Sequence, residues 1–200
     1  MDTLVGVVSI AGMLLFSLIL VLCSYQLRRR KYQRIANELG ADYRSQGLFK
    51  SGAIAGLTNQ RKYTVENEEG ARGSGSFTVI KMECVNKGIP LHIHGRFFKN
   101  FPNWKYAFSE GDRTERVFVT TVTVQNAGIP LEEKYRIQVQ GLFQEFALLN
   151  SEILKRGQVR IEQKSMSFTV HRVLRKVELI REILSILARA ADRIESAPIV

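Results

Sequence analysis

The chain of 200 residues contains only two cysteines, four prolines and three histidines. Cys23 lies in an apolar segment and Cys84 in a strand-like one, so a disulfide framework and a cysteine-ligated zinc site are excluded. The sequence also lacks a phosphate-binding loop with its lysine, a nucleophile elbow and an HExxH motif. These absences remove the enzyme classes with local signatures and leave only catalysis by residues that are distant in sequence.

Charge is missing altogether between Thr3 and Leu27. About 20 apolar residues are enough for a helix to cross a bilayer, so this stretch predicts a transmembrane span. Asp2 precedes the stretch, and cations rather than a small-residue cleavage site follow it, which favours an uncleaved anchor over a removed signal peptide. The cations come within seven positions of one another: Arg28, Arg29, Arg30, Lys31 and Arg34.

The position of these cations also predicts an orientation. Lys and Arg are retained on the cytoplasmic side, so we expect the N-terminus outside and the large C-terminal part in the cytoplasm. The chain divides into an anchor (1–27), a basic juxtamembrane helix (28–40), an α+β domain (41–195) and a flexible tail (196–200). The net charge is +10, and the juxtamembrane cations supply half of it. Such a cluster sets topology and also attracts anionic lipid.

The remaining residues predict an α+β fold with a mostly antiparallel sheet and two amphipathic helices. Gly40 stands where a C-terminal cap would end the juxtamembrane helix. Segments 51–59 and 61–69 are expected to form one hairpin, and segments 76–86 and 89–97 another. A glycine-rich loop separates these hairpins, and a further strand covers 114–126. Helix-like patterns then predict a central helix over 130–149 and, after a short hairpin, a C-terminal helix over about 174–195.

One segment concentrates aromatic residues, with six of the eighteen between Arg96 and Phe108. Asn100, Pro102 and Asn103 indicate a loop. Rings beside cations suit a membrane interface, a protein partner or packing under the loop, whereas membrane tethering makes nucleic acid an unlikely partner. The candidate lipid-contact residues of this segment are Arg96, Lys99, Phe101, Trp104 and Lys105.

His92 and His94 alternate along a predicted strand and therefore point to one side, where two imidazoles could share a metal ion. A solvent-facing pair is the commoner outcome, and no acidic residue follows closely enough to complete a familiar site. The metal interpretation would place a hydrolytic centre near His92, His94 and His171. We otherwise expect no cofactor.

The predicted C-terminal helix carries apolar residues at alternating spacings of three and four, which is a heptad pattern about three repeats long. Such a seam could pair with a second copy of the chain, but three heptads are near the minimum for a coiled coil, and a helix packed on its own sheet is the favoured interpretation. The candidate seam residues are Val177, Ile180, Leu184 and Leu187.

The order of these features resembles that of uncharacterised bacterial single-span membrane proteins: a span, a helix ending in ELGADYR, glycine-punctuated hairpins, an EGD turn at 110–112 and a terminal LSILARAADRIE helix. The resemblance implies a bacterial inner membrane and supplies no catalytic residues. We therefore expect a non-catalytic binding or assembly module that recruits a protein partner or engages anionic lipid. The alternatives are a metal-dependent or hydrolytic enzyme and a structural subunit that dimerises through its C-terminal helix.

Overall fold

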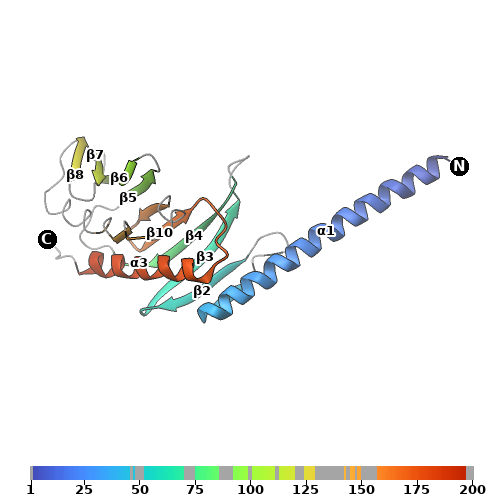
Figure 1. Cartoon of the computed structure of the whole chain (residues 1–200), viewed down its shortest axis with the longest axis horizontal. Coiled ribbons are helices and arrows are strands. Elements are labelled where there is room, and N and C mark those ends of the chain that lie inside the picture. Colours follow the sequence, from blue (N-terminus) through green and yellow to red (C-terminus); the bar gives the residue numbers. More distant parts are fainter. Residues whose placement is uncertain are drawn as a thin grey trace.

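The chain is an α+β protein in which a long N-terminal helix leads into an antiparallel sheet (Figure 1). The computed structural model describes residues 2–45, 47, 52–69, 75–85, 92–98, 101–110, 113–119, 124–128, 142, 145–146, 148–149 and 157–196, with side chains except in 2–11, 69 and 92–128. The helices are α1 (Asp2–Leu39) and α3 (Val177–Glu195). The strands are β1 (Asp42–Arg44), β2 (Ala53–Thr58), β3 (Arg61–Glu69), β4 (Ser76–Glu83), β5 (His92–Phe98), β6 (Phe101–Glu110), β7 (Arg113–Val119), β8 (Val124–Gly128), β9 (Gln158–Ile161) and β10 (Ser165–Val170).

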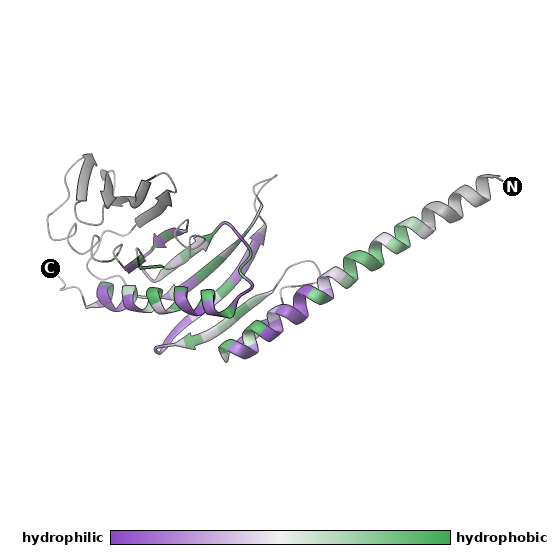
Figure 2. Cartoon of the chain, in the orientation of Figure 1, coloured by the Kyte–Doolittle hydropathy of each residue, from purple (hydrophilic) through white to green (hydrophobic). Residues whose placement is uncertain are grey.

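Helix α1 runs without interruption from the apolar segment into the domain, as the sequence predicts. Figure 2 shows its hydrophobic stretch giving way to a hydrophilic one before the helix meets the sheet. The helix is long and apolar enough to cross a membrane. It ends at Gly40, where φ is +65°; the Gly40 N–H donates to Asn37 and the Ala41 N–H to Ala36. These two bonds form a Schellman motif, so the glycine ends the helix as expected.

The sheet has the strand order β1-β2-β3-β4-β10-β9-β5-β6-β7-β8, and every neighbouring pair is antiparallel. The predicted hairpin of β2 and β3 is confirmed, and its two turn residues, Asn59 and Gln60, both have positive φ. That backbone conformation matches the right-handed twist of the flanking strands. The short hairpin of β9 and β10 is also confirmed.

The predicted pairing of segments 76–86 and 89–97 is wrong. Strand β4 lies between β3 and β10, and β5 lies between β9 and β6. The β9–β10 hairpin, which comes some seventy residues later in the chain, separates the two strands. Alternation along a strand shows which face is buried but does not identify the partner, so sequence proximity gave the wrong neighbour.

The predicted loop over Arg96–Phe108 is also wrong, because its described residues, 96–98 and 101–108, belong to the paired strands β5 and β6. Proline removes a ladder hydrogen bond and is tolerated only where that bond is not needed. The register meets this condition: it shifts after Phe97, which pairs with Trp104, and Phe98 then pairs with Phe101. Pro102 and Asn103 have no partner in this register, so the bulge accommodates both residues within a strand.

Helix α3 covers one face of the sheet and contacts β4, β10 and α1 (Figure 1). It begins three residues later than the sequence suggests and buries the whole apolar stripe. All four seam candidates, Val177, Ile180, Leu184 and Leu187, lie inside the chain's own core. The helix therefore packs on its own sheet, and the structure uses the heptad spacing internally. The sheet side of this core includes Ile54, Val65, Ile80, Met82 and Phe168.

Part of the predicted central helix lies outside the described residues. Leu142, Phe146 and Leu149 are buried in the core, which agrees with the apolar side predicted for this segment. Glu145 is buried beside them, and its carboxylate pairs with Arg189 at 3.0 Å and Arg193 at 2.6 Å. These ion pairs fasten the segment to α3. Residues 197–200 of the predicted tail lie outside the described residues.

Candidate functional site

The most distinctive place in the structure is the junction where α1 enters the domain. Leu27, the last residue of the apolar segment, is 67% exposed, whereas Tyr32 is 4% exposed. Five helical residues rise only about 7.5 Å, so the apolar segment and the domain core nearly touch. Any bilayer surrounding the apolar segment would place its headgroups against the domain.

The second half of α1 is an integral part of the domain. Tyr32, Ile35 and Ala36 are buried in the same core as α3 and the sheet. Two contacts fix the helix further: in its second half Arg181 of α3 donates to the Glu38 carbonyl at 2.5 Å, and at the end of the apolar segment the Tyr25 hydroxyl donates to the Gly47 carbonyl. Because burial and hydrogen bonds hold it on several sides, this part of α1 moves with the domain.

A pocket of about 290 Å³ opens at this junction. Its walls come from α1, from the adjacent ends of β3 and β4, and from the loop that precedes α3. Leu27 and Val173 provide apolar surface, and Glu68 is the one carboxylate among the described residues of the lining. The described lining also contains three cations, so its net charge is positive: Arg28, Lys31 and Arg175.

Two buried polar atoms border this pocket without a hydrogen-bond partner among the described residues: Tyr32 Oη and Asn67 Nδ2. The other side of the amide is occupied, because Thr78 Oγ1 lies 2.7 Å from Asn67 Oδ1. Thr78 is fully buried, accepts the Leu174 N–H at 2.9 Å and lies 2.9 Å from the Arg172 carbonyl. This network connects β3 and β4 to the loop before α3, and it involves neither Tyr32 Oη nor Asn67 Nδ2.

The electrostatics of the hydroxyl agree with this geometry. Burial raises the pKa of Tyr32 above its ordinary value. The nearby Asn67 amide and the positive charges of Arg175 and Arg28 act in the opposite direction, which places all three groups close to the phenol. At neutral pH the Tyr32 hydroxyl is therefore a neutral donor surrounded by positive charge.

The predicted lipid-contact residues differ in where the structure places them. Arg28 and Lys31 face the pocket, whereas Arg30 and Arg34 are exposed away from it and Arg29 is half-buried. Arg96, Phe101, Trp104 and Lys105 lie on β5 and β6, but their side chains, like Lys99 as a whole, lie outside the described part.

The sequence does not identify Arg175 as a site residue, because the predicted C-terminal helix includes it. It lies instead in the loop that ends at the N-cap, Lys176, and its place beside Arg28 depends on the fold. No local spacing relates the two residues, which are more than 140 positions apart. A basic cluster preceding the helix was the one available signal.

The predicted histidine site is not assembled by the described side chains. His92 and His94 belong to β5, and their side chains lie outside the description. His171 is exposed, where its ring faces Phe77 and its Nε2 lies 3.0 Å from Gln158 Nε2. Among the side chains that are described, no three His, Cys, Asp or Glu residues gather as a metal site would require.

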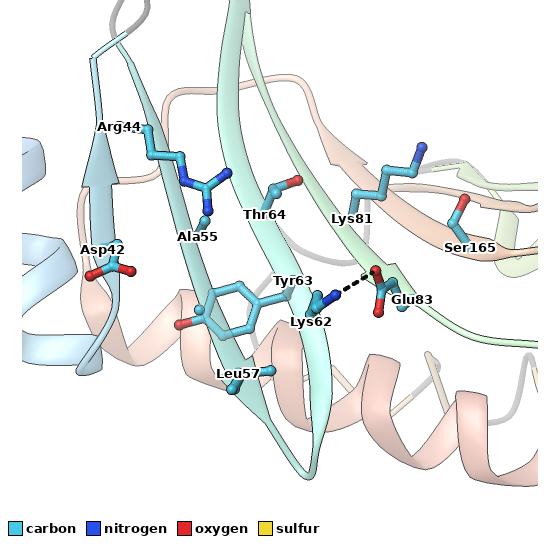
Figure 3. Close-up of a pocket in the computed structure, with 11 residues that line it drawn as sticks. Asp42, Arg44, Ala55, Leu57, Lys62, Tyr63, Thr64, Lys81, Glu83 and Ser165 are labelled. Atoms are coloured by element: carbon cyan, nitrogen blue, oxygen red, sulfur yellow. Dashed lines mark ion pairs between the residues drawn. The ribbon is translucent and has the colours of Figure 1, made fainter.

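A second hollow, of about 380 Å³, lies on the sheet face opposite α3 (Figure 3). Lys62 and Glu83 form a wide ion pair there at 4.0 Å, and both side chains are exposed. The Ser165 hydroxyl donates a hydrogen bond to the Glu162 carboxylate at 3.3 Å. If Ser165 acted as a nucleophile, this carboxylate would have to be the base that removes its proton. The opposite charges of Arg44 and Asp42 leave this hollow with mixed rather than positive character.

Comparison of the chain with known protein families, with curated proteins and with solved structures gives no match.

Proposed function

We propose that this protein is a membrane-anchored, non-catalytic binding module whose α+β domain is held against the bilayer and engages anionic lipid. The apolar half of α1 spans the membrane, with the N-terminus outside and the domain in the cytoplasm. The basic residues at Arg28–Arg34 then lie at the level of the headgroups on the cytoplasmic side.

One observation carries this proposal: a single helix is exposed and apolar over one half and buried in the domain core over the other. A flexible linker would allow the domain to drift away from the bilayer, but a continuous helix fixes both its distance and its orientation. The domain surface around Leu27 is therefore presented permanently to lipid.

The charge at the junction supports lipid as the ligand in preference to a protein partner. Each Lys or Arg near an anionic leaflet contributes about 1 kcal/mol of attraction. The five juxtamembrane cations lie directly beyond the apolar segment, and Arg175 adds another from the loop before α3. The mixed charge of the open sheet face offers no comparable preference for a partner.

The test is a depth measurement on the full chain in vesicles. Ser76 stands at the membrane-proximal end of the β3–β4 pair, and Leu57 pairs with Lys62 at the distal end. Along β3 these two ends are about 23 Å apart. Ser76→Cys and Leu57→Cys, each in a Cys23→Ala background, would carry a fluorophore, with a quencher attached to lipid headgroups.

We expect strong quenching at position 76 and little at position 57. Cys84 is a suitable silent residue, because burial raises its pKa to about 11 and keeps the thiol protonated and inaccessible. Equal quenching at both positions would contradict a domain held in one orientation against the surface, and so would its absence at both.

The metal-dependent enzyme is the alternative. It requires stoichiometric metal in the purified full chain that is lost when His92 and His94 are changed together to Ala. That result would move the function to the β5 strand, and a metal content that is unaffected by the double change would count against a site there.

A further inference from the structure

The junction pocket has the composition of a specific site within a generally basic surface. Arg28 and Lys31 are three residues apart and therefore share one face of α1, whereas Arg30 lies on a different face. Arg175 approaches from a separate segment of the chain. Three cations from two segments converge on one cavity, which a simple topology signal does not require.

The cavity also offers neutral donors at its inner end. The Tyr32 hydroxyl is buried beside the Asn67 amide, and within the described structure neither it nor the Asn67 amide nitrogen makes a hydrogen bond of good geometry. A buried polar group without a well-formed hydrogen bond destabilises the protein, and a ligand that accepts from it recovers that loss when it binds. Oxygen atoms of a phosphate accept hydrogen bonds from hydroxyl, amide and guanidinium groups alike.

The apolar part of the lining indicates where the rest of the ligand lies. Leu27, which ends the apolar segment of α1, forms one wall beside Val173. A ligand with its phosphate among the cations would have its apolar portion pass Leu27 toward the hydrocarbon region. The pocket therefore combines an anion site with an exit to lipid.

We propose that the junction pocket binds the phosphate of one anionic phospholipid whose headgroup carries hydroxyl groups. Arg28, Lys31 and Arg175 hold the phosphate, and Tyr32 and Asn67 donate to its oxygens. Glu68 and Ser76 then accept hydrogen bonds from headgroup hydroxyls. This inference rests on the proposed function, because the pocket reaches lipid only if the apolar half of α1 lies in a bilayer.

The experiment compares lipid retention by the full chain, extracted from nanodiscs and measured by native mass spectrometry. The discs contain phosphatidylglycerol and phosphatidylcholine in equal amounts. Two matched pairs separate the pocket from general charge: Arg175→Gln with Lys176→Gln, and Arg28→Gln with Arg30→Gln. In each pair the net charge is the same, but only the first residue lines the pocket.

We expect one retained phosphatidylglycerol in the unmodified chain and a loss of about tenfold in apparent affinity for Arg175→Gln and for Arg28→Gln. The matched controls should stay within about twofold of the unmodified chain. Both arginines are exposed, so the variants are expected to fold, and circular dichroism before extraction checks that they do.

Equal loss within both pairs would overturn the pocket and leave only diffuse attraction to the membrane. Displacement of the lipid by millimolar inorganic phosphate would overturn the lipid assignment in favour of a free oxyanion. Retention of phosphatidylcholine to the same extent would overturn the requirement for an anionic headgroup. None of these results depends on the quenching at positions 76 and 57, so failure of the pocket is distinguishable from failure of the proposed function.

Discussion

The two halves of α1 show how one secondary structure serves two environments. Between Gly12 and Leu27 its apolar side chains are exposed, whereas Tyr32, Ile35 and Ala36 are among the most buried residues of the domain. The sequence changes character at Arg28, but the backbone continues unbroken to Leu39. The difference shows that an apolar side chain belongs to the core only where other side chains surround it. Substituting a matched residue in each half of α1 tests this conclusion.

The largest expected effect comes from the isoleucine pair. Ile35 is 4% exposed in the domain core and Ile19 is 48% exposed in the apolar half. Truncation of a buried isoleucine removes transfer energy and leaves a cavity, so Ile35→Ala should lower the free energy of unfolding of the domain by about 2–4 kcal/mol. Ile19→Ala should change it by less than about 0.5 kcal/mol.

Denaturant titration of the full chain in mild detergent, followed by far-ultraviolet circular dichroism, provides this measurement. Comparable losses for the two variants would break the comparison, because they would show that the apolar half also packs against the domain.

The buried cysteine gives the next effect, which depends on pH. Burial raises the pKa of Cys84 to about 11, and the negative charge of Glu195 adds to that rise. The unfolded chain therefore loses the thiol proton first as pH rises. The stability that comes from keeping this thiol protonated is fully present below about pH 8 and is lost between about pH 9 and 11, by roughly 2–3 kcal/mol.

Cys84→Ala should flatten this part of the profile of unfolding free energy against pH relative to the unmodified chain. Tyr32, Tyr43 and Tyr63 also have raised pKa values through burial, so some alkaline loss remains above pH 10 in both proteins. An identical slope in Cys84→Ala and the unmodified chain would contradict the assignment.

The glycine pair sharpens the comparison at the level of the backbone. Adding a Cβ meets no atom within 4 Å at either Gly12 or Gly40, so packing does not decide the outcome. Gly40 has φ of +65°, and Gly40→Ala should destabilise the domain by about 1 kcal/mol. Gly12 lies inside α1, so Gly12→Ala should instead stabilise the helix by up to about 1 kcal/mol.

Thermal unfolding monitored at 222 nm checks both signs. A stabilising Gly40→Ala would show that the Schellman geometry is not what ends α1.

The parts of this structure that the sequence predicts are those determined by local rules. Alternation identified the β2–β3 hairpin, and the spacing of apolar residues identified α3 within three residues of its start. Strand order depends on pairing between segments far apart, such as β4 with β10, and no local pattern encodes it. The same limit applies to the site: Arg28 and Lys31 follow from their position after the apolar segment, but Arg175 joins them only through the fold.

The smallest expected effect, and the most discriminating, comes from the tyrosine pair. The Tyr25 hydroxyl donates to the Gly47 carbonyl, so Tyr25→Phe removes a hydrogen bond and should cost about 0.5–1.5 kcal/mol of domain stability. Tyr32→Phe removes a buried hydroxyl that makes no hydrogen bond of good geometry with the described residues, so the lipid-free domain should be unchanged or more stable by up to about 1 kcal/mol. The same variant should retain less phosphatidylglycerol, because it loses a donor to the phosphate. Stability and lipid retention would then move in opposite directions, which a purely structural role for Tyr32 does not predict. If Tyr32→Phe instead lowered both together, the hydroxyl would belong to the network that holds α1 in the domain, and the ligand would depend on the three cations alone.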